Sequence, residues 1–102
     1  MTLIDQHTKD IRHLCSKYKV RHLYAFGSVL TDQFKQDSDI DFLVDFEPID
    51  INLYADNYFN FKFALEDTFN RPIDLLEEKA IKNPFFKKVI ENQRQLIYGY
   101  RD

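Results

Sequence analysis

Asp39 and Asp41 flank Ile40 at the start of an apolar segment that ends at Phe46. In a β-strand, side chains two positions apart point to the same face, so we expect both carboxylates on one face with Cα atoms about 7 Å apart. The opposite face is expected to pack against the helices through its apolar residues Ile40, Phe42, Val44 and Phe46. Two ionised carboxylates in close proximity repel each other, and a bound cation offsets that repulsion. Aspartate oxygens suit Mg²⁺, which takes its remaining ligands from water and substrate phosphates. The pair therefore predicts a magnesium site.

Asp74 repeats this pattern in a later apolar segment, between Ile73 and Leu75. If that segment is a strand beside the one that follows Asp39, the three aspartates share one face of the sheet. Three converging carboxylates can hold two metal ions, or one metal ion and a general base. We therefore predict Asp39, Asp41 and Asp74 as catalytic and metal-binding residues, with one or two Mg²⁺ ions. Asp45 shares the face but lies farther along the strand, and we interpret it as peripheral.

Gly27 and Ser28 follow the β-branched and aromatic run of residues 20–26. A glycine at the end of a strand lets backbone N–H groups approach a ligand closely, and a following helix would present its positive N-terminal end. The Ser28 hydroxyl is a further donor, and it could also cap that helix. We predict Gly27 and Ser28 as the binding site for nucleotide phosphates. Phosphates beside a metal site favour phosphoryl or nucleotidyl transfer.

The elements that must position these residues alternate between helices and strands along the chain. We expect helices over residues 3–18, 28–34, 51–70 and 83–98, and strands over residues 20–26, 40–46 and 73–76. The order αβαβαβα predicts a mixed α/β fold, with a small sheet of about three strands flanked by helices. The 102 residues are expected to form one domain over 1–102.

Composition narrows the class of protein. A net charge of −3 argues against a broad nucleic-acid surface, which needs a basic face. No apolar run approaches the ~20 residues of a membrane span, and the charged N-terminus does not resemble a signal peptide. Cys15 is the one cysteine and has no disulfide mate, which favours a reducing compartment. We expect a cytoplasmic protein that binds neither nucleic acid nor membrane.

The helix expected over residues 51–70 has an unusually wide apolar stripe. Part of that stripe is predicted to pack against the sheet. The rest, with Tyr54, Tyr58 or Phe61 as candidates, is predicted to lie in a protein interface. A homo-oligomer stays possible on this reading.

The ordered set of Phe26-Gly27-Ser28, ten intervening residues and Asp39-Ile40-Asp41-Phe42-Leu43-Val44 resembles the signature of the polymerase-beta-like nucleotidyltransferase superfamily. The short length is similar to its minimal group, the MNT proteins encoded beside HEPN-domain proteins. The resemblance implies that Asp39 and Asp41 bind Mg²⁺, and that Asp74 binds metal or activates the acceptor hydroxyl. It also implies that Gly27 and Ser28 hold the phosphates of ATP.

The same resemblance implies an antitoxin that pairs with a HEPN toxin and transfers AMP from ATP to one of its tyrosines. The chain departs from many relatives in one respect: no arginine follows the Gly-Ser turn, where Val29-Leu30-Thr31-Asp32 stands. Two other functions remain open at this point. The chain could be an antitoxin that masks its toxin sterically with a vestigial site, or a transferase acting on a small molecule such as an aminoglycoside.

Overall fold

The computed structural model describes residues 2–99, which form one small sheet with helices on both of its faces. In chain order the elements are α1 (Thr2–Asp5), α2 (Thr8–Lys17), β1 (Val20–Phe26), the 3₁₀ turn η1 (Gly27–Leu30), β2 (Ile40–Phe46), α3 (Ile51–Phe69), β3 (Ile73–Glu77), the 3₁₀ turn η2 (Glu78–Ala80), α4 (Pro84–Gln93) and β4 (Gln95–Tyr98). The mixed α/β class predicted from the sequence is confirmed, and β1 and β2 have the predicted bounds.

The sheet has the strand order β3-β2-β1-β4. β1 runs antiparallel to both β2 and β4, whereas β2 and β3 are parallel. A parallel pair needs a crossover connection, and the 19-residue helix α3 supplies it. Because β2 and β3 run side by side in the same direction, the residues that begin these two strands lie at the same end of the sheet.

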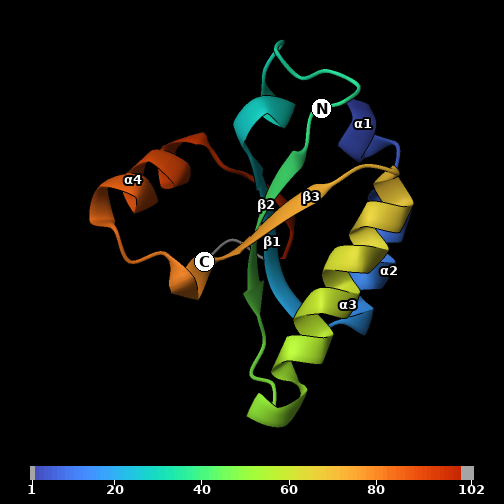
Figure 1. The fold of residues 1–102 in the computed structure, drawn as a ribbon, viewed down its shortest axis with the longest axis vertical. Helices are drawn as coiled ribbons and strands as arrows, with labels where there is room; N and C mark the ends of the chain where they lie inside the picture. The colour runs from blue at the N-terminus through green and yellow to red at the C-terminus, as the bar shows by residue number, and fades with distance from the viewer. Residues whose placement is uncertain (1, 100–102) are drawn as a thin grey trace.

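Helices α2 and α3 cover one face of the sheet, and α4 lies on the other (Figure 1). Alternate residues of β2 point to the α2–α3 side and are buried there, as the sequence pattern predicted: Ile40, Phe42, Val44 and Phe46. On the opposite face Leu43 is also buried, and it lines a small hollow together with Ile90 of α4. Helix α4 thus lies against the second face near Leu43, chiefly through Ile90.

The first helix is two helices rather than the single one predicted over residues 3–18. α1 ends at Asp5, and α2 begins at Thr8. The hydroxyl of Thr8 donates to the carbonyl of Asp5 at 3.0 Å, at the break between the two helices. Such local side-chain bonds compete with a continuous helix. Ile4 of α1 and Ile11 of α2 are nevertheless both buried in the core.

The last helix ends at Gln93, so the prediction of a helix to Tyr98 and of about three strands was wrong. Asn83 and Pro84 begin α4 as expected, since the Asn83 side chain accepts hydrogen bonds from Phe85 N and Phe86 N at 2.9 and 3.2 Å. The chain then turns back at Arg94 and adds β4 to the edge of β1. This pairing satisfies backbone N–H and C=O groups along the outer side of β1, and the non-local gain outweighs the local helical spacing.

The wide apolar stripe of α3 divides differently from the prediction. Phe61 is fully buried in the core, so its assignment to an interface was wrong. Tyr58 is half-buried, and its hydroxyl donates to the carbonyl of Leu75. The large apolar side chains of α3 that point outward include Phe59 and Phe63, about half exposed at 48% and 53%, and Ile51 and Leu53 in the first turn. Within residues 2–99, no helix is long and apolar enough to cross a bilayer.

Candidate active site

Asp41 and Asp74 face each other across the parallel pair β2–β3. The two residues are register partners, so their Cα atoms are separated by about the 4.8 Å between neighbouring strands. On the other side of Asp41, the register partner is Phe26, the last residue of β1. Asp39 lies two residues before Asp41, immediately ahead of β2. The structure thus brings Asp41 and Asp74 together and places Asp39 at the same end of the sheet.

The charges of Asp39 and Asp74 act on the carboxyl group of Asp41. Its pKa is raised, first because the side chain is half-buried, then because the charges of Asp74 and Asp39 repel a third one. Asp39 and Asp74 are exposed at the edge of the sheet. An arrangement that raises the energy of its own ionised form is suited to binding a cation.

Gly27 brings the backbone of the turn directly against this cluster. Its φ of +77° lies in the left-handed region, and a Cβ on it would lie 2.3 Å from Asp41 Oδ2. Only a residue without a side chain allows this approach. The predicted phosphate turn and the predicted metal carboxylates are therefore adjacent in space.

The turn after Gly27 is shorter than the predicted helix over residues 28–34. It is one 3₁₀ turn ending at Leu30. Its N-cap is Phe26 with no side-chain cap, so Ser28 lies inside the turn, where its carbonyl accepts bonds from Thr31 N and Thr31 Oγ1, both at 2.9 Å. The hydroxyl of Ser28 is thus left out of helix capping. A four-residue turn supplies little helix dipole, so any phosphate binding here rests on backbone N–H groups and the Ser28 hydroxyl.

The carboxylates fit a hard cation, with some ligands left to the substrate. Among the described residues, no three His, Cys, Asp or Glu side chains are spaced to hold one ion in the arrangement of the structure. Mg²⁺ commonly uses only one or two protein carboxylates and completes its shell with water and phosphate oxygens. The carboxylate oxygens at this end of the sheet suit that mode of metal binding.

Arg71 lies between α3 and β3, beside the candidate site. Its Nη1 donates to the carbonyls of Lys35 and Ser38 at 3.1 and 3.0 Å, and its guanidinium lies 4.7 Å from the ring centroid of Phe34. These contacts hold the loop that leads into Asp39. No periodicity or motif in the sequence indicates them.

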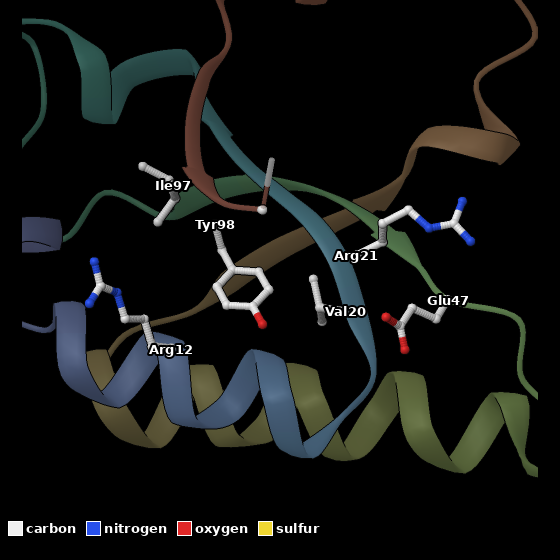
Figure 2. A pocket seen from close by; sticks show the side chains of 7 residues that line it. Arg12, Val20, Arg21, Glu47, Ile97 and Tyr98 are labelled. Carbon is white, nitrogen blue, oxygen red and sulfur yellow. The ribbon is translucent and has the colours of Figure 1, made fainter. Parts of the chain in front are cut away.

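A second hollow of about 420 Å³ lies at the other end of β1, away from the aspartates. Figure 2 shows Tyr98 in its middle, with Arg12 and Arg21 on either side and their guanidinium groups pointing apart. Because the two charges do not converge, this hollow lacks a focused anion site. By contrast, the end of the sheet with Asp41, Asp74 and Gly27 combines two carboxylates with a glycine turn.

The raised pKa of Asp41 gives a stability prediction. A carboxyl whose folded pKa is raised favours the fold when protonated, and that contribution is lost as the pH rises through the raised pKa. In the presence of EDTA, Asp41→Asn should therefore raise the melting temperature at about pH 7.5, and the gain should shrink towards about pH 3.5. Thermal unfolding followed by circular dichroism across this range checks it. A gain that does not change with pH would contradict this account of the pKa.

Two curated relatives are similar over nearly their whole lengths. The chain is 35% identical over 99 residues to a Methanocaldococcus jannaschii protein named "Putative protein adenylyltransferase MJ1217", covering 94% of this chain and 90% of the relative. It is 30% identical over 97 residues to the protein adenylyltransferase MntA of Thermococcus cleftensis, covering 95% of this chain and 89% of that relative.

Among solved structures, the fold matches a chain in the complex of a tri-AMPylated Shewanella oneidensis HEPN toxin with an MNT antitoxin. The TM-score is 0.64 at 18% identity, covering 95% of this chain and 73% of the other, a likeness that concerns the fold alone. The sequence model of the family described as "Polymerase beta, Nucleotidyltransferase" matches residues 9–102. With the match to that family and the two curated relatives, this chain belongs to the polymerase beta nucleotidyltransferase family and is a nucleotidyltransferase.

Proposed function

We propose that this nucleotidyltransferase moves AMP from Mg-ATP to a tyrosine hydroxyl of a partner HEPN toxin, and so acts as its antitoxin. The observation that carries the proposal is the contact of the Gly27 turn with Asp41, beside its strand partner Asp74. A phosphate-binding turn against a carboxylate pair is what transfer at a phosphorus atom requires. The choice of AMP, protein acceptor and toxin partner is supported by the names of the similar proteins.

Each residue has a separate task in this proposal. Backbone N–H groups at Gly27 and Ser28, with the Ser28 hydroxyl, bind the phosphates. Asp39 and Asp41 hold Mg²⁺, and Asp74 either joins them or serves as the general base. Bound Mg²⁺ would supply positive charge to offset the charge that develops on the phosphate oxygens.

The transfer balances with groups that this chain and its substrates supply. The acceptor oxygen forms a bond to the α-phosphorus of ATP, and the bond from that phosphorus to the bridging oxygen of the β-phosphate breaks. Pyrophosphate leaves with that electron pair. Where Asp74 serves as the general base, the hydroxyl proton passes to its carboxylate, which is exposed on β3 and accessible to an incoming acceptor.

The test compares two labels with one partner. The chain is incubated with Mg²⁺, with ATP labelled on the α- or the γ-phosphate, and with the HEPN protein encoded beside its gene. We expect the α-label, but not the γ-label, to appear on a tyrosine of the partner, and the double variant Asp39→Asn/Asp41→Asn to transfer none. An unlabelled partner with the wild-type chain, or equal labelling by the double variant, rules the proposal out.

The same variant separates transfer from steric masking. If AMP transfer is what neutralises the toxin, cells that express the toxin with the double variant should stop growing. The variant should still bind the toxin in a pull-down, because the substitutions change charge without removing volume. Full neutralisation by the double variant would instead assign this chain a masking role.

A further inference from the structure

We propose that Arg71 is a positioning residue for nucleotidyl transfer, an inference that rests on the function proposed above. Its role is to fix the loop over residues 31–39, so that Asp39 lies at the same end of the sheet as Asp41 and Asp74. Arg71 follows Asn70, whose left-handed backbone (φ 52°, ψ 46°) ends α3. It therefore lies between the crossover helix and β3, beneath the loop that precedes β2.

The contacts of Arg71 converge on the end of this loop. One nitrogen, Nη1, donates to two carbonyls, those of Lys35 and Ser38. The loop also closes on itself there, since Lys35 N donates to Ser38 Oγ at 3.0 Å and Ser38 N donates to Lys35 O at 3.1 Å. The guanidinium stacks on Phe34 at the same place. A planar, delocalised guanidinium can lie against the Phe34 ring while one of its nitrogens donates to the loop, and an ammonium makes the ring contact less well.

These contacts bear directly on Asp39. The carbonyl of Ser38 belongs to the peptide unit that continues into Asp39, so holding this carbonyl fixes the plane from which the Asp39 side chain projects. Beyond Asp39, Ile40 N donates to the carbonyl of Pro72 at 3.2 Å, and Ile40 is the register partner of Ile73. Arg71 is thus joined through neighbouring residues to the two strands that carry the aspartates.

The surroundings of Arg71 also favour a task beyond general stability. Its Nε is buried and has no hydrogen-bond partner among residues 2–99, and no carboxylate pairs with the guanidinium in that part of the chain. A buried donor without a partner is unfavourable, and such groups in folded proteins call for an explanation. The bonds from Nη1 to the loop offset this cost, and a loop held in one conformation favours transfer, because small displacements of reacting groups are costly to rate.

Three variants separate positioning from stability: Arg71→Met, Arg71→Lys, and Arg12→Met as a matched control on the exposed side of α2. With Mg-ATP and the HEPN partner, we expect Arg71→Met to lower kcat per folded molecule by about tenfold to a hundredfold, with the KM for ATP changed by less than about threefold. Arg71→Lys should recover part of kcat, and Arg12→Met should match the wild type. A kcat for Arg71→Met within about twofold of the wild type would overturn the proposal.

Hydrogen exchange gives a readout that needs no activity. In Arg71→Met the amide hydrogens of Ser38 and Ile40 should exchange at least about tenfold faster than in the wild type, whereas Arg12→Met should leave them unchanged. Unchanged exchange would refute the loop contact as the means of positioning. If the wild-type chain labels no partner while exchange still rises in Arg71→Met, the proposed function fails but the hold of Arg71 on the loop stands.

Discussion

Asp41→Asn is expected to lower AMP transfer by about 100- to 1,000-fold while the fold is retained. Asp41 is central to the candidate site, with Asp74 as its register partner on β3 and the Gly27 turn against its Oδ2 atom. The amide has nearly the same shape but carries no charge, so it weakens both cation binding and the field at the phosphates. Initial rates of label transfer from α-labelled ATP measure the loss.

Asp45→Asn is the matched control, because it removes a carboxylate from the same face of the same strand. The Asp45 carboxylate lies 3.2 Å from His22 Nδ1 and 3.8 Å from Arg21 Nη1. Along β2 it is separated from Asp41 by Leu43. We expect its transfer rate to stay within about threefold of the wild type. Equal losses in the two variants would mean that overall charge on the strand matters, and that a local site at Asp41 does not exist.

Gly27→Ala is the second variant with a large expected effect, and it acts on both stability and transfer. Alanine at a left-handed position costs about 1–2 kcal/mol of folding free energy. The new methyl group would also lie 2.3 Å from Asp41 Oδ2 and must push that carboxylate away. Because displacement of a reacting group is costly, we expect a loss of transfer of about 100-fold beyond the loss of folded protein. Denaturant unfolding and rates per folded molecule separate the two effects.

Gly99→Ala serves as its control. Gly99 also has a positive φ, 109°, and a Cβ there would lie 2.3 Å from the carbonyl oxygen of Arg21. The cost to stability should therefore resemble or exceed that of Gly27→Ala. The turn at Gly99 lies at the other end of β1, so transfer per folded molecule should be unchanged. A comparable loss of transfer in both variants would refute the specific contact between Gly27 and Asp41.

Much of the fold follows from local sequence, where local and tertiary preferences agree. The alternation of apolar residues along β2 fixes which face is buried, and the structure buries Ile40, Phe42, Val44 and Phe46 as predicted. β4 could not be predicted in this way. Its residues continue a helical spacing, and only the open edge of β1, which is 70 positions away in the sequence for the pair Ala25 and Gln95, makes them a strand.

The site was predictable to the extent that strand parity decides it. Parity places Asp41 and Asp74 on one face, and their register pairing across β2 and β3 brings them together. The surroundings depended on packing that no local pattern encodes. Gly27 contacts the Asp41 carboxylate rather than beginning a long helix, and Arg71 reaches a loop 33 positions earlier in the chain. Such contacts depend on how the loop ends and the helix ends meet.

The most direct test of the account is a crystal structure of this chain with Mg²⁺ and a non-hydrolysable ATP analogue. We expect at least one metal ion bonded to carboxylate oxygens of Asp39 and Asp41, with Asp74 beside it and the phosphates against the turn at Gly27 and Ser28. The central claim is that this end of the sheet is the transfer site. It would be contradicted by a nucleotide bound in the hollow around Tyr98, or by phosphates and metal that do not touch these aspartates.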